Sequence, residues 1–529
     1  MPAFRKTTCP AGGAHLTKLI FSAGGRNCGL PGNELVCFGG LPNWNGSPQN
    51  LTTWTAGYAK GTTVITLGNT SGLIPGVTLL ILDQANDTSD TGQVFVCDTS
   101  ICRDPAETPS PGRTVGGVNY NQQEYKLVTA VKGNQVTISP PLYMPNWRAS
   151  QKPSAWARTG GPAIVSAGIE DLSIQQPANL ITTFGVFNAY NCWIKGVRSI
   201  HSGDTNGARN QAYMQYSARI TIRDSYFYGN RGGGNLSYTI EPWQSGDLLV
   251  ENNFFQHSTT PLLIGNTIGS VFAYNYSIDH ETFRTNPAWN MPGPSWTHDA
   301  GVSMNLIEGN QGTEMIEDDI HGTHNLDTYF RNQWSGRDPT RTQQTNAVLL
   351  APFNRYMNIV GNVMGEGNYH NRYENIHPSA VKCDTSIFII GWHGGPCTSV
   401  GLTDGLTATT LMRWGNYDTV NNAVRFDAGE NGSGAPVLPA LSDPSRALPP
   451  SFYLSAKPTW WPASKPWPAV GPDVTGGNVT SGTGAASTLG GHAYKIPARD
   501  CYETTPQDGA NPYKLFNAAA CYRLLPRNP

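Results

Sequence analysis

The feature that most constrains the fold is a short apolar segment, ending in Asn, Asp or Gly, that recurs through the middle of the chain. A unit of this size buries too little apolar surface to fold alone, so neighbouring units must stack. The repeat therefore predicts a solenoid with one such strand in each coil. With steps of 25, 28, 28, 23, 35, 22 and 30 residues, the copies end at Asp171, Gly196, Asp224, Asn252, Asn275, Asn310, Asn332 and Asn362.

A second set of apolar segments precedes the first by several residues, so each coil is expected to hold at least two short strands. The turns between them are rich in Asn and Gly, which tolerate the left-handed backbone of tight corners. A two-sheet sandwich also consists of short strands, but it does not produce a regular repeat. The pattern therefore predicts an all-β parallel β-helix. The second set ends at Asn188, Gln215, Glu241, Gly265, Glu317 and Ala351.

The chain divides into four expected regions. Residues 1–50 are cysteine-rich and loop-like, which predicts a cap over one end of the solenoid. Residues 51–150 alternate strands with turn residues, and we expect a small β-barrel or sandwich module there. The β-helix, with its binding or catalytic face, is expected over 151–400. Residues 401–529 are rich in Pro, Gly and Ser, which predicts an irregular wrap along the outside of the solenoid and a tail tied by a disulfide. The expected anchors of this wrap are Trp460, Trp461 and Trp467.

Composition narrows the class of protein. Only 14% of the residues are charged and the net charge is −2, so charge gives no support for a nucleic-acid or membrane-surface role. No apolar run is long enough to span a bilayer. Close cysteine pairs predict disulfides formed in an oxidising compartment. We therefore expect a secreted, extracellular protein whose leader is not part of this sequence. The expected pairs are Cys97–Cys102, Cys383–Cys397 and Cys501–Cys521, with the pairing among Cys9, Cys28 and Cys37 open and Cys192 a buried free thiol.

The densest group of ionisable residues lies on one coil and its following turns. Successive side chains of a strand alternate between faces, so Glu317 and Asp319 are expected on one face and Asp318 on the other, unless a turn begins there. The same residues can instead be turn residues that hydrogen-bond the backbone. The group comprises Glu314, Glu317, Asp318, Asp319, His321, His324 and Asp327.

An equivalent strand of an earlier coil carries Glu241, with Trp243 beside it, and Gln215 extends the line. This predicts a polar groove crossed by an aromatic ring, a surface on which sugar rings stack. Residues 280–300 interrupt the repeat and include the pair His298 and Asp299. Long loops that leave a rigid scaffold often carry function, so this pair is a candidate for substrate binding.

Three chemistries can use these residues. A paired-carboxylate hydrolase needs one protonated and one ionised acid, which Glu317 and Asp319 can supply, alone or with Glu241 or Asp299. A uronate lyase needs a group that neutralises the carboxylate, often Ca²⁺ on acidic oxygens, and a base. The candidates for that base are Arg337, Arg341, His321 and His324. A transition-metal centre on His321, His324 and carboxylates is the third chemistry, although i,i+3 spacing implies a shared face only on a helix. For Arg337 and Arg341, surface ion pairs are the structural alternative.

The repeats and the N-terminal module together resemble the pectate-lyase-like family of right-handed parallel β-helix proteins, over about 160–380. The segment Ser277-Ile-Asp279-His280 is similar to the family's Trp-Ile-Asp-His, in which the Asp binds calcium. The segment Arg337-Asp-Pro-Thr-Arg341 is similar to the catalytic Arg-x-Pro-x-x-Arg, with one residue fewer before the second Arg. Asp318-Asp319 with the following His321-Gly322 resembles the polygalacturonase Asp-Asp motif, whereas Asn-Thr-Asp is absent. The resemblance implies a right-handed β-helix that acts on carbohydrate, with Asp279 as a ligand of Ca²⁺. Asp318, in the acidic group, is the second expected ligand of Ca²⁺.

The sequence thus predicts a secreted enzyme that binds and cleaves a polysaccharide, as a glycoside hydrolase or a polysaccharide lyase. The alternative is a non-catalytic polysaccharide-binding or adhesion protein with structural Ca²⁺. We expect a monomer or a homotrimer. The expected catalytic residues are Glu317, Asp318, Asp319, His321, Glu241, Arg337 and Arg341. The expected substrate-binding residues are Trp243, Gln215, His298, Asp299 and His324.

Overall fold

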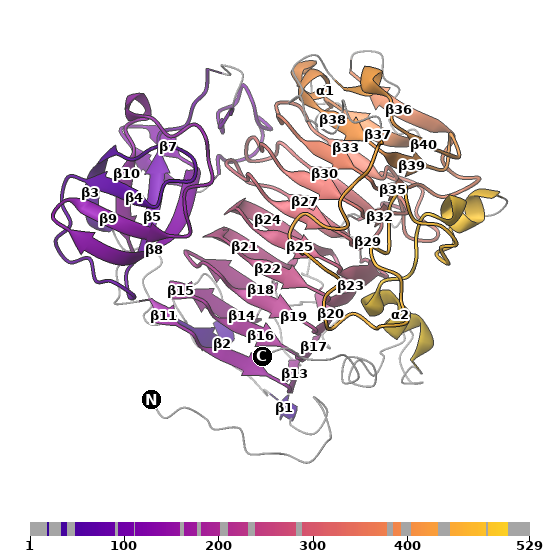
Figure 1. Ribbon diagram of the computed structural model, residues 1–529, viewed down its shortest axis with the longest axis horizontal. Coiled ribbons are helices and arrows are strands. Elements are labelled where there is room, and N and C mark those ends of the chain that lie inside the picture. The colour runs from indigo at the N-terminus through magenta and orange to yellow at the C-terminus, as the bar shows by residue number, and fades with distance from the viewer. Residues whose placement is uncertain are drawn as a thin grey trace.

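A computed structural model describes most of the chain (Figure 1). The described residues are 18–20, 33–39, 48–89, 94–110, 112–158, 163–176, 181–201, 210–230, 238–281, 288–291, 293–377, 385–392, 402, 404–431, 445–482 and 485–505.

Three long sheets of stacked strands form the body of the protein, and each full coil adds one strand to sheet 1, then to sheet 2, then to sheet 3 (Figure 1). Sheet 1 has the order β2 (Asn33–Phe38), β14 (Ile181–Phe187), β18 (Asn210–Gln215), β21 (Tyr238–Gly246), β24 (Thr260–Ile268), β27 (Pro294–Thr297), β30 (Glu314–Glu317), β33 (Val348–Leu350), β37 (Ser386–Ile390) and β36 (Arg372–Ile376).

The other two sheets follow the same order of coils. Sheet 2 consists of β12 (Gly168–Glu170), β16 (Trp193–Lys195), β19 (Thr221–Arg223), β22 (Leu249–Glu251), β25 (Val271–Ala273), β28 (Leu306–Glu308), β31 (Thr328–Phe330), β34 (Asn358–Val360) and β38 (Met412–Trp414). Sheet 3 consists of β1 (Lys18–Ile20), β13 (Ser173–Gln176), β17 (Arg198–His201), β20 (Tyr226–Asn230), β23 (Phe254–Ser258), β26 (Tyr276–Ile278), β29 (Gln311–Gly312), β32 (Gln333–Trp334), β35 (Val363–Met364), β39 (Asn416–Asp418) and β40 (Ala423–Arg425).

Neighbouring strands of these sheets pair in parallel, except β39 with β40, so the predicted parallel β-helix is confirmed. The coils extend further in sequence than expected. Strands β1 and β2 of the expected cap pair in parallel with β13 and β14, and the last coil ends at β39, beyond residue 400. The minor elements are β11 (Ile164–Val165), β15 (Ala189–Tyr190), the hairpin β6 (Arg113–Val115) and β7 (Val118–Tyr120), and the helices α1 (Leu406–Thr410) and α2 (Pro497–Thr504).

A ladder of buried asparagines occupies the corner between sheets 2 and 3. Each side-chain amide donates to the Oδ1 atom of the next member at 3.0–3.1 Å, and the same Oδ1 accepts a backbone N–H of the coil before. Each member thereby satisfies backbone groups that would otherwise be buried without a partner. The members are Asn253, Asn275, Asn310, Asn332, Asn362 and Asn416.

The sequence repeat located this corner, but it aligned residues from two adjacent positions of the corner as if they were one position. Asn253, rather than Asn252, is the ladder residue. Glu251 pairs with Ala273, so the residues two positions after each, Asn253 and Asn275, lie at the same level. Asn252 instead adopts a left-handed φ of 53°, as do Asp171 and Asp224 at 56° and 52°. Such backbone is the one that Asn and Asp tolerate better than most residues.

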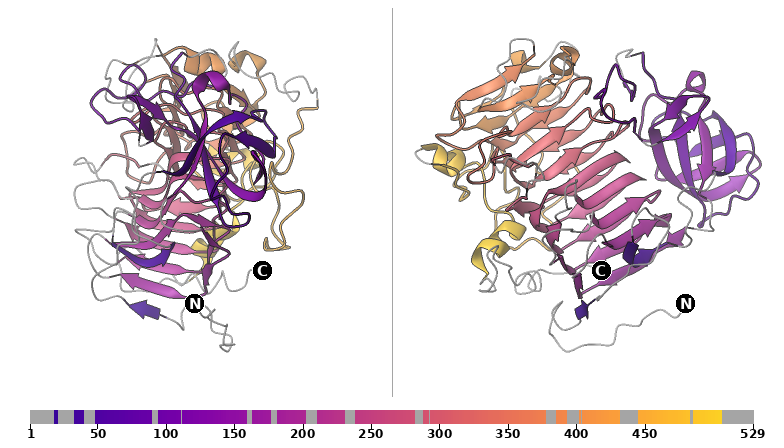
Figure 2. Two further views of the ribbon diagram at one scale, coloured as in Figure 1. Left: turned by 90° about the vertical axis from the view of Figure 1, so that its left-hand side faces the viewer. Right: turned by 180° about the vertical axis from the view of Figure 1, so that it is seen from behind.

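The N-terminal module is a closed barrel, packed beside the coils (Figures 1 and 2). Its apolar core continues onto the outer face of sheet 1, where the rings of Trp156 and Tyr216 meet edge to face at 5.7 Å. The expected disulfide Cys97–Cys102 and the buried free thiol of Cys192 are both present. The barrel strands are β3 (Gln49–Ala56), β4 (Val64–Leu67), β5 (Leu79–Gln84), β8 (Gln122–Lys132), β9 (Gln135–Ser139) and β10 (Ser154–Ala157).

The other cysteine pairs are only partly within the described residues. Cys37 and Cys501 are each disulfide-bonded. The expected pair Cys383–Cys397 lies outside the described residues, as do Cys9, Cys28 and Cys521.

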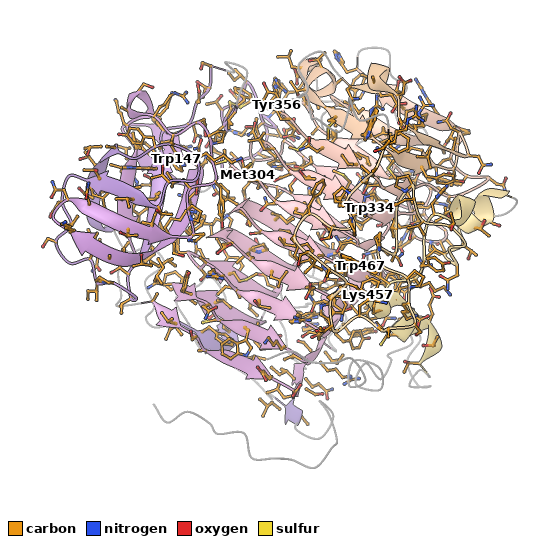
Figure 3. The ribbon with its side chains drawn as sticks, viewed as in Figure 1. Trp147, Met304, Trp334, Tyr356, Lys457 and Trp467 are labelled. Atoms are coloured by element: carbon orange, nitrogen blue, oxygen red, sulfur yellow. A yellow bond between two sulfur atoms is a disulfide. The ribbon has the colours of Figure 1, made fainter. Side chains whose placement is uncertain are left out.

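The C-terminal segment runs irregularly along the outside of the β-helix, on the side away from the barrel (Figures 1 and 2). As expected, its tryptophans anchor it. The rings of Trp460 and Trp461 are buried 5.8 and 5.1 Å from the ring of Tyr274, and Trp467 Nε1 donates to Tyr274 Oη at 3.1 Å. Figure 3 shows Trp467 and Trp147, which belongs to the barrel, on different sides of the molecule. The outer face of sheet 3 is therefore largely covered by this segment.

We expect Asn310→Ala to lower the free energy of unfolding by about 3 kcal/mol, because it removes ladder bonds and leaves buried backbone groups unpaired. Denaturant unfolding followed by circular dichroism measures the change. The control Asn134→Ala, at an exposed hairpin turn, should change stability by less than about 0.5 kcal/mol. Equal stability of the two variants would contradict a structural role for the ladder.

Candidate functional site

The expected site residues are separated by the alternation of side chains along sheet 1. In β30, Met315 packs in the core of the coils, whereas Ile316 packs outside, against Trp296 of β27. Glu317 therefore faces the interior, and Asp318 faces outward just beyond the strand. Strand β30 ends at Glu317, so the regular alternation from which Glu317 and Asp319 were expected to share a face does not extend to Asp319.

Glu317 belongs to a polar cluster inside the coils. Its carboxylate accepts hydrogen bonds from Tyr329 Oη at 2.5 Å, from Thr297 Oγ1 and from His324 Nδ1 at 2.8 Å. Burial and then the charge of Glu317 raise the pKa of the neighbouring Asp327 carboxyl. Glu317, His324, Asp327 and Tyr329 have no exposed surface, so these groups stabilise the interior and do not meet a polymer.

Outside the coils, His298 and Asp318 form a close pair. His298 Nδ1 donates to Asp318 Oδ2 at 2.5 Å, and the same oxygen accepts from Trp296 Nε1 at 2.5 Å. The other carboxylate oxygen accepts the backbone N–H of Ile320 at 3.0 Å. Both side chains are only 7% exposed, so their charges are held in a region from which most water is excluded.

The pKa shifts of this pair both favour the charged forms, because the pKa of His298 is raised and that of Asp318 is lowered. Burial by itself lowers the pKa of His298, but the carboxylate of Asp318, followed by those of Asp299 and Glu241, raises it above its ordinary value. Burial tends to raise the pKa of Asp318, but His298 outweighs that effect and lowers it. The two shifts therefore favour an imidazolium on His298 and a carboxylate on Asp318, and the carboxyl groups of Asp299 and Glu241 lie near the imidazole.

The indole of Trp243 and the backbone of Gly265, which has no side chain, adjoin this acidic group. Gln215 pairs in register with Trp243, which pairs with Gly265, so the three lie side by side on the outer face of β18, β21 and β24. A Cβ atom on Gly265 would lie 2.3 Å from Asp299 Oδ2 and 3.1 Å from Trp243 Cδ1. Glycine at this position therefore lets the Asp299 carboxylate approach the strand beside the indole.

The barrel module supplies one wall of the site, through residues that sequence reasoning missed. Ser110 Oγ donates to the backbone carbonyl of His321 at 3.0 Å and accepts the N–H of Ala300 at 2.5 Å. His321 Nδ1 lies 2.8 Å from the carbonyl of Thr108, and its ring centre lies 4.5 Å from that of His298. Asp319 is buried close by, and its carbonyl accepts the N–H of Asp104 at 3.0 Å. No motif marks Ser110, because only the docking of the barrel brings it here.

The expected arginine candidates lie elsewhere, beside sheet 3. Arg337 forms two 2.8 Å hydrogen bonds with Glu366, and its guanidinium lies 3.7 Å from the ring centre of Tyr369. Arg341 Nη2 donates to the carbonyl of His280 at 2.9 Å. The fold therefore does not bring Arg337 and Arg341 to the outer face of sheet 1, where Asp318 lies.

The two expected calcium ligands have surroundings that do not fit that ion. Calcium takes six to eight oxygen ligands. Asp318 is surrounded by the N–H donors of His298, Trp296 and Ile320, and Asp279 by the Gln256 amide and the Tyr502 hydroxyl. Among the described residues, no group of three or more His, Cys, Asp or Glu side chains is arranged to hold a metal ion.

Comparisons with known proteins give likenesses of structure only. No protein-family model matches the chain, and no curated protein matches it. Membership of the pectate-lyase-like family therefore stays a prediction. In the described part of the chain, no helix is both long enough and apolar enough to cross a membrane.

Among solved structures, the chain is similar to three phage tailspikes. The tailspike of Pseudomonas phage LKA1 is 14% identical with a TM-score of 0.41, over 64% of this chain and 51% of that one. The tailspike of Pseudomonas phage phi297 is 12% identical with a TM-score of 0.38, over 77% and 71%. The tailspike of Acinetobacter baumannii bacteriophage AP22, solved with a capsular saccharide, is 14% identical with a TM-score of 0.37, over 72% and 55%. The chain thus spans about half the length of the first and third of these proteins.

We expect Asp318→Asn to lower the pKa of His298, because the largest charge that favours the imidazolium is lost. NMR titration of the imidazole resonances measures this, and the distant His370 serves as the internal control. In the native protein, His298 stabilises folding fully below its unfolded pKa of 6.5, and this contribution is lost as the pH rises through its raised folded pKa. An unchanged titration of His298 in the variant would contradict the ion pair.

Proposed function

We propose that the protein binds a neutral polysaccharide on the outer face of sheet 1, beside the barrel, and cleaves it by hydrolysis of glycosidic bonds. The observation that carries the proposal is the His298–Asp318 ion pair, flanked by Asp299 and Glu241 and placed next to Trp243. Repeated coils supply a long, rigid surface, and the indole supplies a face on which a sugar ring can stack.

Charge favours hydrolysis of a neutral polymer over elimination from a uronate. The site contains one imidazolium and the carboxyl groups of Asp318, Asp299 and Glu241, so it is net negative when these are ionised. A polymer of uronic acids would bring further negative charge into a region of low dielectric, where repulsion is strong. The arginines that would offset this repulsion lie on another face, beside sheet 3.

Glycoside hydrolysis needs a proton donor for the leaving oxygen and a carboxylate that activates water or attacks the sugar. We assign these roles to the pair Asp299 and Glu241, whose carboxyl groups face His298. Asp318 favours the protonated form of His298, so the two act by setting the charge around that pair. Asp299 is adjacent to Trp243, which places its carboxyl group beside a ring stacked on the indole.

The oxidised cysteines support a secreted protein. Cys97 and Cys102 form a disulfide, and Cys37 and Cys501 are also disulfide-bonded. Disulfides of this kind persist in oxidising compartments and are rare in the cytosol.

Substitution of either proposed acid tests the hydrolase. We expect Asp299→Asn and Glu241→Gln each to lower the release of reducing ends by roughly 10²- to 10⁴-fold, with polymer binding retained. The assay uses a panel of neutral and acidic polysaccharides and also follows the ultraviolet absorbance of unsaturated products. Glu107→Gln, at an exposed carboxyl group on the barrel loop that carries Ser110, is the matched control and should retain full activity.

The panel also separates the alternatives. Reducing ends together with ultraviolet absorbance on an acidic polymer would replace the hydrolase with a lyase. Binding without any product would replace the enzyme with a polysaccharide-binding protein.

Trp243→Ala should weaken polymer binding roughly tenfold, because it removes the stacking face. Isothermal calorimetry with an oligosaccharide cut from the bound polymer measures the loss. Trp193→Ala is the control, since Trp193 lies on sheet 2, where its indole N–H donates to Glu170. Equal losses in the two variants would contradict binding on sheet 1.

A further inference from the structure

One segment of the barrel module extends to the coils and docks on the residues that follow β30. We call this segment, residues 94–110, the barrel arm. Three backbone hydrogen bonds of 3.0–3.2 Å, spread along the arm, join it to residues 319–323. The arm is therefore held over its length rather than at one point. The bonded pairs are Thr323 with Cys97, Asp104 with Asp319, and Ser110 with His321.

Two side chains of the coils also bind the start of the arm. Thr323 Oγ1 accepts the N–H of Cys97 at 3.0 Å. Asn325 Oδ1 accepts the N–H of Phe95 at 3.1 Å, and Asn325 Nδ2 donates to the carbonyl of Phe95 at 3.0 Å. Thr323 and Asn325 have no exposed surface, so undocking of the arm would leave buried polar groups without these partners.

The contact at Gly322 is too close for a side chain. A Cβ atom at this position would lie 2.5 Å from the carbonyl oxygen of Cys97 and 2.5 Å from Ala300 Cβ. The φ of Gly322 is 142°, in the region that favours glycine. Glycine at this position therefore permits the docked arrangement.

The disulfide Cys97–Cys102 lies at the docked interface. Both cysteines have no exposed surface, and they form a small apolar cluster with Phe95 and with Phe353 of the coils. Two thiols need more room than one S–S bond, and well-packed clusters tolerate added volume poorly. Reduction would also free the chain between the two cysteines. The oxidised form of the arm is therefore the one that fits the coils.

The docked arm supplies groups to the proposed site on sheet 1. Ser110 Oγ accepts the N–H of Ala300 at 2.5 Å and lies 3.4 Å from Asp299 Oδ1. His321 Nδ1 lies 2.8 Å from the carbonyl of Thr108. A carbonyl can only accept, so the arm fixes a proton on Nδ1 of this imidazole. Release of the arm would remove these contacts and open the surroundings of Asp299 to water.

We propose that the Cys97–Cys102 disulfide is a redox-sensitive clamp, which holds the barrel arm on the coils when oxidised and releases it when reduced. In formation of the bond, the two thiols lose two protons and two electrons. A small-molecule disulfide such as oxidised glutathione takes these up and becomes two thiols. A dithiol reverses the step and is itself closed to a disulfide. The effect of the clamp on polymer cleavage rests on the proposed function, whereas docking of the arm does not.

Limited proteolysis tests docking on the full-length protein. Trypsin cleaves after Arg103, and the N–H of the next residue, Asp104, donates to the carbonyl of Asp319, so the docked arm protects this bond. We expect dithiothreitol to speed cleavage at Arg103 by about tenfold or more, because cleavage follows the population of the released arm. The double variant Cys97→Ser, Cys102→Ser should be cleaved as fast without reductant. Peptide mass spectrometry locates and times the cut.

Dithiothreitol also acts on the disulfides of Cys37 and Cys501, so the double variant serves a second purpose. Added reductant should leave its rate of cleavage at Arg103 unchanged. Gly322→Ala should speed cleavage with the disulfide intact, because the new methyl group meets the carbonyl of Cys97. Ser71→Ala, at an exposed turn of the barrel, is the matched control and should be cleaved as slowly as the native protein.

Equal rates of cleavage at Arg103 in the oxidised and reduced native protein would overturn the clamp, and this comparison needs no variant to fold. Release of reducing ends should fall about tenfold in the reduced protein, in step with the population of the docked arm. Faster cleavage of the arm with unchanged release of reducing ends would overturn its part in the site. A native protein that releases no reducing ends would contradict the proposed function, and the trypsin comparison would still decide whether the clamp exists.

Discussion

The asparagine ladder and the parallel backbone pairing fix the register between coils, and the rest of the structure depends on that register. Because each ladder residue bonds to its counterpart in the next coil, one coil cannot slip against another without leaving buried amides unpaired. A slip of one residue would also exchange the inner and outer faces of every strand. The outer columns of side chains therefore stay aligned over many coils, as a site assembled from several of them requires.

The same alternation gives neighbouring acidic residues different tasks. Glu317 is buried in the coils, where hydrogen bonds from Tyr329 and His324 satisfy its carboxylate. Asp318, one residue later, lies outside and pairs with His298. A buried carboxylate that is fully hydrogen-bonded stabilises the interior, whereas an ion pair on the outer face of the sheet can act on a ligand. The position of each residue relative to the end of β30 decides which of these two roles its carboxylate has.

Two segments distant in sequence cover two faces of one scaffold. On the outer face of sheet 1, the barrel packs against the strands and supplies Ser110 and Thr108 to the wall around His298 and His321. On sheet 3, the C-terminal segment covers the strands and borders a cavity whose walls include Tyr276, Gln333 and Arg499. In both places a segment distant in sequence covers a surface made by the coils.

The sequence by itself determined the parallel β-helix, the separate N-terminal module, the tryptophan anchors of the tail and the disulfide Cys97–Cys102. These features follow from local periodicity, composition and spacing, which are readable along the chain. It also singled out Glu241, Trp243, His298, Asp299 and Asp318, because only 14% of the residues are charged and a concentration of ionisable groups stands out. Only the tertiary structure decided that Glu317 and His324 are internal, since the end of β30 depends on pairing with its neighbours. It alone brought Ser110 to His321 and Asp338 to His280, because contacts between residues far apart in sequence leave no local pattern.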